Sequence, residues 1–333
     1  MLWRLLSRFL AALLIAATLI APAHAAPSLA QVQAQVAALE DDATSAAEGV
    51  QEAKVKLSAL TKTLKGVKAK AAVQGQTLSA LQKSVGTIAV EQYKAGGMGQ
   101  SLELLFSSDP ALYLSAAGSL DSISRRKSAQ LRKYHASQQR LNATTLTIKD
   151  KLALVAAAEK KLKVQSAIAK AKLAQAEAIL SKLTKAERER LAKLADDQEN
   201  ADQAASKALA KKVSGLSGRG GTALKFALSQ LGDRYVFGAA GLVTWDCSGL
   251  TMRAYQKAGV SLPHSSAAQA RMGKPVSFKS LQPGDLLFYG RPVSHVAMYL
   301  GGGKMIHAPR RGSRVKIAGL SMGSKPLVGA RRY

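Results

Sequence analysis

Cysteine is almost absent from this sequence, since Cys247 is the only one among 333 residues. A single cysteine excludes an intramolecular disulfide, and it excludes a lipid anchor carried by a cysteine near the N-terminus. One leftover cysteine leaves three alternatives: an intermolecular bridge, a buried inert thiol or a reactive thiol. The residues around Cys247, described below, favour the reactive thiol.

Acidic residues are also scarce, with 21 against 48 lysines and arginines, and the formal net charge is +27. Residues 216–333 contain 17 basic residues and only three acidic ones, all Asp, which gives this part a net charge of +14. Such a surface attracts polyanions. Nucleic acid is the usual partner of so basic a chain, but the export signal described next favours anionic cell-wall polymers or membrane surfaces. We expect no nucleic-acid partner; a basic composition without a specific partner is the alternative.

The N-terminal segment has the features of an export signal. Arg4 and Arg8 precede an uncharged apolar run over residues 9–20, and small residues flank His24 shortly afterwards. This run is too short to span the roughly 30 Å hydrocarbon core of a bilayer as a helix. We therefore predict a signal peptide over residues 1–25 and a secreted protein in the cell wall or the extracellular space. A retained membrane anchor is the alternative.

Proline is missing between Pro27 and Pro110, and again between Pro110 and Pro263. Both stretches are rich in Ala, Leu, Lys, Gln and Glu, which favour helices. In the first stretch, apolar residues follow a 3,4 spacing over residues 29–88, and Gln74 is the one polar member of this seam. A period of 3.5 residues sustained over so many heptads is typical of a coiled coil.

The first helix is predicted to end near Gly96-Gly97, and a second helix with a patchier seam is predicted over about residues 120–194. Two long helices joined by a short break most simply form an antiparallel hairpin, and a parallel homodimer is the competing arrangement. We therefore expect an all-α coiled-coil hairpin over residues 26–198. Loss of apolar periodicity and a Ser- and Gly-rich end predict a flexible linker over residues 199–218.

Residues 219–333 differ in composition, because proline, glycine and aromatic residues return and short apolar runs replace the long periodic ones. The runs at residues 286–289 and 296–300 are bounded by Gly and Pro and predict strands. Residues 222–231 and 248–258 are typical of helices. Helices followed by strands favour an α+β domain.

Three separated residues carry the chemistry that we expect of this domain. Cys247 stands at the predicted start of a helix, His295 at the head of a strand and His307 at the end of the next one. A thiol needs a base, and the base needs a third group to orient it. The helix N-terminus would stabilise a thiolate, its N–H groups could face an oxyanion, and Asp246 is suited to cap it. One Cys and two His make a poor zinc site, so we expect no metal and no cofactor.

Six short segments stand out in the C-terminal part. They are Gly-Asp-Arg-Tyr-Val-Phe-Gly at 232–238, Asp-Cys-Ser-Gly-Leu at 246–250, Leu-Pro at 262–263, Leu-Gln-Pro-Gly-Asp-Leu-Leu-Phe at 281–288, Ser-His-Val at 294–296 and Ile-His-Ala-Pro at 306–309. In their order and spacing these segments resemble NlpC/P60 hydrolases, and the resemblance covers the region from about residue 219 to residue 333.

The resemblance implies a papain-like α+β fold, so that the expected fold class is this domain preceded by the all-α coiled-coil hairpin. It also implies roles for three residues: Cys247 as nucleophile, His295 as general base and acid, and His307 as the group that orients His295. The candidates for substrate binding or oxyanion stabilisation are Tyr235, Asp246 and Ser248. The sequence departs from the family pattern, without losing a catalytic group, at Phe237, at residues 239–240 and at residues 264–266. His264 is interpreted as a groove or loop residue.

The usual reaction of the family is hydrolysis of the amide bond between D-γ-glutamyl and the diamino acid of peptidoglycan stem peptides. The resemblance therefore implies a peptidoglycan endopeptidase in cell-wall remodelling or daughter-cell separation. An amidase or acyltransferase with the same three residues is an alternative, as is a non-enzymatic coiled-coil regulator of other wall hydrolases. Expected partners are stem peptides, anionic wall polymers, and a regulatory protein or a second copy bound through the coiled coil. The hairpin is expected either to cover the Cys247 groove, to tether the domain, or to serve as a spacer or dimerisation stalk.

Overall fold

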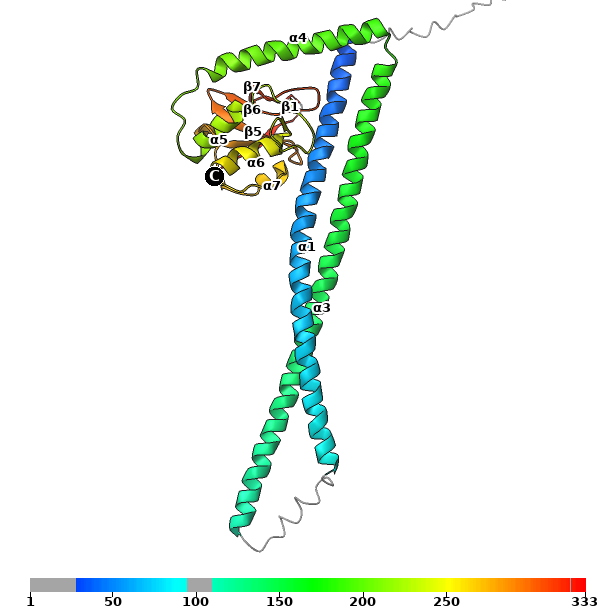
Figure 1. Ribbon diagram of the computed structural model, residues 1–333, viewed down its shortest axis with the longest axis vertical. Helices are drawn as coiled ribbons and strands as arrows, with labels where there is room; N and C mark the ends of the chain where they lie inside the picture. Colours follow the sequence, from blue (N-terminus) through cyan, green and yellow to red (C-terminus); the bar gives the residue numbers. More distant parts are fainter. Residues whose placement is uncertain (1–27, 95–109, 324) are drawn as a thin grey trace, which may run out of the picture.

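The computed structural model describes residues 28–94, 110–323 and 325–333, and combines a long helical hairpin with a C-terminal domain beside one of its ends (Figure 1). The signal peptide predicted for residues 1–25 and the helix end predicted at Gly96-Gly97 lie outside the described residues. Over the described ranges, no helix is both long enough and apolar enough to cross a membrane.

The elements follow one another as helices first and mainly strands afterwards. The helices are α1 (Leu29–Lys94), α3 (Pro110–Ser181), α4 (Lys185–Ala210), α5 (Gly218–Ser229), α6 (Cys247–Lys257) and α7 (Ser266–Gln269), with a 3₁₀ turn η1 (Phe278–Ser280). The strands are β1 (Arg234–Tyr235), β2 (Thr244–Trp245), β3 (Lys274–Pro275), β4 (Leu286–Tyr289), β5 (His295–Gly301), β6 (Lys304–His307), β7 (Lys316–Gly319) and β8 (Leu327–Arg332).

Helices α1 and α3 form an antiparallel hairpin within one chain (Figure 1). Lys127 donates to Gln92 near one end, and Lys172 donates to Asp42 near the other, so residue numbers fall along α1 as they rise along α3. Members of the predicted seam are buried between residues 32 and 64 of α1. They are Val32, Ala43, Ala46, Val50, Ala53 and Leu64.

The second long helix is displaced from its predicted range. Helix α3 begins at Pro110 rather than near residue 120 and ends at Ser181. Proline suits the first turn of a helix because its missing N–H would be unpaired there in any case. After a short break, α4 begins with a capping box: the Thr184 hydroxyl accepts from the Glu187 N–H, and the Glu187 carboxylate accepts from the Thr184 N–H. This box starts a new helix instead of a linker.

The flexible linker predicted over residues 199–218 is wrong for residues 199–210, which belong to α4. Two polar side chains attach α4 to β7 and to Val315, the residue that precedes β7. The Ser206 hydroxyl accepts from the Ile317 N–H at 2.9 Å, and the Gln203 amide donates to the Val315 carbonyl at 3.2 Å. The composition predicted flexibility because this helix carries little apolar periodicity. Tertiary hydrogen bonds, together with packing of Leu209 and Ala210 against the core of the domain, hold it in place.

The C-terminal domain is built on a six-stranded sheet in the order β3-β8-β4-β5-β6-β7, and each neighbouring pair is antiparallel. Helices α5 and α6 pack together, and α6 packs on β5. Leu224 of α5, Leu250 of α6 and Val296 of β5 are fully or almost fully buried in the resulting core. The predicted fold class, a helical hairpin followed by an α+β domain with helices on an antiparallel sheet, is confirmed.

A second face of α1, beside the seam, is buried against the C-terminal domain. Its residues are Thr44, Ala47, Glu48 and Gln51. Their spacing of three and four residues places them on one side of the helix. The heptad pattern predicted the face of α1 that packs on α3 but gave no indication of this one.

Gly249 in α6 permits a close approach that no other residue allows. A Cβ at this position would lie 2.3 Å from the Ala239 carbonyl oxygen. Helix propensity alone would favour alanine by about 1 kcal/mol, but the clash outweighs it, so Gly249→Ala should lower the free energy of unfolding by about 1–3 kcal/mol. Gly319→Ala is the control, because no atom lies within 4 Å of its added Cβ. Equal denaturant midpoints for the two variants would contradict the expectation.

Candidate functional site

Cys247 is the first residue of α6, and Asp246 caps this helix. The Asp246 Oδ1 accepts a hydrogen bond from the Gly249 N–H at 2.6 Å. Asp246 and Cys247 are both fully buried. The predicted helix start is therefore confirmed, and the thiol lies where unpaired N–H groups and the helix dipole favour negative charge.

His295 and His307 are brought together by the pairing of adjacent antiparallel strands. His295 opens β5 and His307 closes β6. The His295 Nε2 lies 3.0 Å from the His307 Nδ1, and the two rings meet edge to face. Over the described residues, the other nitrogen of each ring, His295 Nδ1 and His307 Nε2, is buried without a hydrogen-bond partner.

The thiol lies at the head of the same strand. The backbone N–H of Val296, the residue after His295, donates a hydrogen bond to the Cys247 sulfur. The fold thus gathers Cys247, His295 and His307 from three elements. In the part of the chain that the structure describes, no hydrogen bond joins Cys247 to His295; the thiol donates elsewhere.

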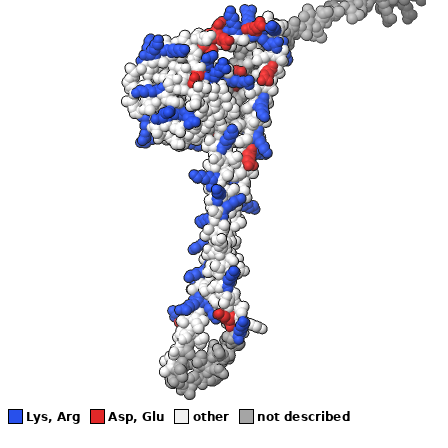
Figure 2. Space-filling view, viewed as in Figure 1, with Lys and Arg blue, Asp and Glu red and all other residues white. Residues whose placement is uncertain are grey.

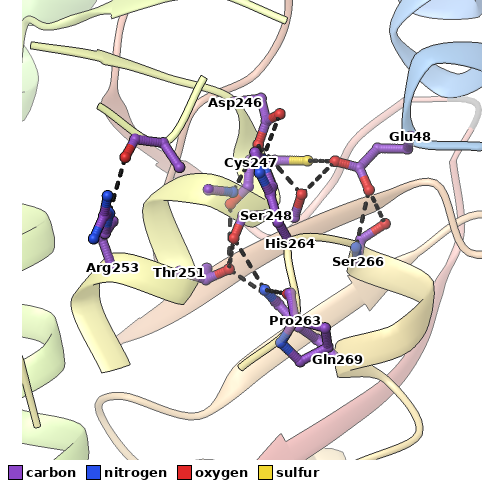
Figure 3. A network of polar contacts seen from close by, with 12 residues as sticks. Glu48, Asp246, Cys247, Ser248, Thr251, Arg253, Pro263, His264, Ser266 and Gln269 are labelled. Atoms are coloured by element: carbon purple, nitrogen blue, oxygen red, sulfur yellow. Dashed lines mark hydrogen bonds and ion pairs between the residues drawn. The ribbon is translucent and has the colours of Figure 1, made fainter. Parts of the chain in front are cut away.

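The hydrogen-bond acceptor of the thiol is a carboxyl group from the hairpin (Figure 3). The Cys247 Sγ lies 3.2 Å from Glu48 Oε1 of α1, which also accepts from the Ser248 hydroxyl at 2.7 Å. Glu48 Oε2 accepts from the Ser266 N–H at 2.9 Å and from the Ser266 hydroxyl at 2.8 Å. Glu48 thus fills the space directly beside the nucleophile candidate with every oxygen hydrogen-bonded.

Sequence reasoning did not single out Glu48, although one signal was present. Helix α1 contains six acidic residues, and five of them fall within thirteen positions. They are Glu40, Asp41, Asp42, Glu48 and Glu52, with Glu91 far along the helix. In a chain this basic, such a cluster indicates a face that meets basic residues.

His264, interpreted from the sequence as a groove or loop residue, contacts the helix cap. Its Nε2 lies 2.8 Å from both carboxylate oxygens of Asp246. Burial opposes the charged imidazole, but the hydrogen bond and the negative charge of Asp246 outweigh it and raise the pKa of His264. Asp246 also accepts from the Ser248 hydroxyl at 3.2 Å. These contacts make Asp246 a positioning group for the loop and the helix start.

Tyr235, a predicted candidate for substrate binding or oxyanion stabilisation, lies near the thiol. It is 5 % exposed, and the side chain of Thr44 in α1 lies close to its hydroxyl. Burial raises the pKa of Tyr235 well above its usual value, and the negative charges of Cys247 and Asp246 would raise it further. Its hydroxyl therefore stays protonated, near the Cys247 sulfur.

Burial also controls protonation of the thiol and the two imidazoles. It raises the pKa of Cys247 well above its usual value, with the charges of Glu48 and Asp246 acting in the same direction. Burial holds the pKa of His295 well below its usual value, and a positive charge on His307 would lower it further. Burial, with nearby lysines, lowers the pKa of His307 to about 3. All three groups are therefore neutral in this arrangement, and the nucleophile candidate is a thiol rather than a thiolate.

Comparison with known proteins identifies the family of the C-terminal part. Residues 232–332 match the NlpC/P60 family. A protein of Mycobacterium tuberculosis named "Probable endopeptidase" is 42% identical over 119 residues, which are 36% of this chain and 31% of that protein. A "Gamma-D-glutamyl-L-lysine dipeptidyl-peptidase" of Bacillus cereus is 39% identical over 110 residues, which are 31% of this chain and 33% of that protein.

Solved structures of the family cover the same part. A crystal structure of an NlpC/P60 family protein from Bacillus cereus is 36% identical, with a TM-score of 0.33, and the match covers 34% of this chain and 40% of that one. The structure of NlpC2 from Trichomonas vaginalis is 32% identical, with a TM-score of 0.34, over 37% of this chain and 49% of that one. The chain spans about a third of the length of the curated relatives named above. Residues 232–332 are an NlpC/P60 family domain.

Proposed function

We propose that this protein is a secreted peptidoglycan endopeptidase that cleaves the amide bond between D-γ-glutamyl and the diamino acid of the stem peptide. Two observations support the proposal: the family match over residues 232–332, and relatives that are named endopeptidases or a γ-D-glutamyl-L-lysine dipeptidyl-peptidase. The observation that carries the chemistry is the 3.0 Å hydrogen bond between His295 Nε2 and His307 Nδ1. This bond leaves the other nitrogen of His295, Nδ1, without a partner among the described residues. His295 also precedes Val296, whose backbone N–H donates to the Cys247 sulfur.

In the proposed reaction, His295 takes the proton of the Cys247 thiol, and the sulfur attacks the carbonyl carbon of the scissile amide. The carbonyl oxygen becomes an oxyanion, which backbone N–H groups at the start of α6 and the Tyr235 hydroxyl can stabilise. The C–N bond then breaks as His295 gives its proton to the leaving amine, which leaves a thioester on Cys247. His295 next removes a proton from water, the hydroxide attacks the thioester carbonyl, and a carboxylate and the free thiol result. His307 orients His295 through both halves of the reaction.

The proposal is tested by the termini that the protein creates. Isolated sacculi are digested with the full chain, and the fragments are separated and analysed by mass spectrometry. The proposal predicts new diamino-acid amines and new D-glutamyl γ-carboxylates. New termini at the sugar–peptide junction would instead indicate an amidase, and transfer of an acyl group to an added amine would indicate an acyltransferase.

The basic surface predicts attachment to anionic wall polymers. Because the screening length falls from about 10 Å at 0.1 M salt to about 3 Å at 1 M salt, sedimentation of the protein with sacculi should weaken strongly across this range. The expected loss is at least about tenfold in bound protein, since a net charge of +14 on residues 216–333 makes long-range attraction the main contribution. Binding that is unchanged by salt would instead indicate apolar or shape recognition of the wall.

A further inference from the structure

We propose that Glu48 is an internal inhibitor of the Cys247 site, so that the protein is exported in a closed state and becomes active when α1 leaves the C-terminal domain. The inference rests on the proposed function. It concerns a contact between residues almost two hundred positions apart in the chain, and its test has a readout that does not require hydrolysis.

Glu48 lies directly against the nucleophile candidate. Its carboxyl group contacts the sulfur of Cys247 and uses the hydroxyl of Ser248 and the N–H and hydroxyl of Ser266 (Figure 3). Glu48 is only 3 % exposed, and the thiol is not exposed at all. An amide substrate must reach the sulfur within van der Waals distance before attack. Substrate and Glu48 therefore cannot occupy this site together.

Glu48 also opposes ionisation of the Cys247 thiol through its negative charge. Glu48 adds negative charge beside a group that must become an anion to react, and with burial it raises the pKa of Cys247. Burial and Asp246 likewise raise the pKa of Glu48. Removal of α1 would restore solvent to the groove and take away the nearest carboxyl group, and both changes favour the thiolate. The closed state thus suppresses the nucleophile as well as covering it.

The interface between the helices and the C-terminal domain carries opposite charges on its two sides. Figure 2 shows most of the visible Asp and Glu at the end of the molecule where the C-terminal domain adjoins the helices. The helices contribute the acidic partner of each interface ion pair, and the domain contributes the basic one. The pairs are Asp41 with Lys325, Glu52 with Arg271, Glu40 with Arg310, and both Asp202 and Glu199 with Lys316.

Such an interface suits reversible release. Most of these ion pairs are partly exposed, where each contributes little and is weakened by salt or by a competing charge. The residues beside Glu48 on the same face of α1 are small or polar: Thr44 and Ala47 precede it, and Gln51 follows it. Around Glu48, the hairpin thus meets the domain through small and polar side chains.

The test measures how readily Cys247 reacts with iodoacetamide in the full chain, followed by mass spectrometry. Because the chain contains one cysteine, the reaction reports a single site. Glu48→Ala removes the acceptor of the Ser248 hydroxyl and of the Ser266 N–H and hydroxyl. These donors can then form hydrogen bonds only with water, which requires α1 to move away from the site. Alkylation should be at least about tenfold faster than in the parent protein. Glu91→Ala, an exposed carboxyl group on the same helix, is the matched control and should alter the rate by less than about twofold.

A second variant leaves the hairpin and the catalytic groups unchanged. Arg271→Glu combined with Arg310→Glu reverses the domain side of two ion pairs and should also speed alkylation at least about tenfold. Lys257→Glu combined with Lys279→Glu makes the same change in net charge on exposed residues and should not. If circular dichroism shows that Glu48→Ala does not fold, the comparison of these two double variants tests the proposal. Parent-like alkylation in both Glu48→Ala and the reversed variant would overturn the proposal.

Hydrolysis of sacculi separates this inference from the proposed function. Faster alkylation together with faster hydrolysis in the opened variants supports both. Faster alkylation with no cleavage by any variant would refute the proposed function and leave the closed contact standing. Cleavage by the parent protein as fast as by the opened variants would refute inhibition and leave the proposed function standing.

Discussion

Cys247→Ala should abolish peptidoglycan hydrolysis, with a loss of at least about 10⁴-fold in kcat, since the Cys247 sulfur forms the acyl intermediate of the proposed reaction. The chain contains no second cysteine that could substitute. Cys247→Ser should be almost as severe, because a hydroxyl group is far harder to ionise than a thiol. Release of stem-peptide fragments, followed by liquid chromatography, measures the effect.

The assay should be run in the parent protein and in a Glu48→Ala background, so that closure by the hairpin does not mask the loss. The fold should be retained, since alanine is smaller than cysteine and the cap at Asp246 is untouched. A denaturant midpoint close to that of the parent serves as the control. Residual hydrolysis above about one per cent by Cys247→Ala would exclude Cys247 as the nucleophile.

His295→Ala and His307→Ala should differ in size and in kind. His295 exchanges the proton, so its loss should lower kcat by about 10³-fold or more. His307 acts on the substrate only through its hydrogen bond to His295 Nε2, so its loss should lower kcat by about 10–100-fold with little change in KM. The two variants are compared in the same fragment-release assay, again in the Glu48→Ala background.

A conservative variant separates positioning from a merely structural role. His307→Gln keeps a polar side chain that can bond His295 and should recover much of the activity lost in His307→Ala. Equal losses in these two variants, with equal stability, would contradict the positioning role. A larger loss in His307→Ala than in His295→Ala would exchange the two roles.

Local pattern was sufficient to locate the nucleophile candidate and the long helices. Asp246, followed by Cys247, indicates the start of a capped helix, because a capping side chain accepts from the backbone N–H of a residue only three positions later. The seam of α1 was visible because packing of two long helices repeats every 3.5 residues. The placement of His295 and His307 at strand ends also followed from short apolar runs, and antiparallel pairing of β5 with β6 then brings the two rings together.

The sequence by itself therefore determined which residues are available for chemistry and which face of α1 packs on α3. The tertiary structure decided what lies against the thiol, because Glu48 and Cys247 are separated by 199 positions and no local period relates them. It also decided that residues 199–210 are helical, since Gln203 and Ser206 find their partners on and beside β7, more than a hundred residues away. Periodicity records contacts that repeat along a helix; a contact made once, between distant segments, leaves no period to detect.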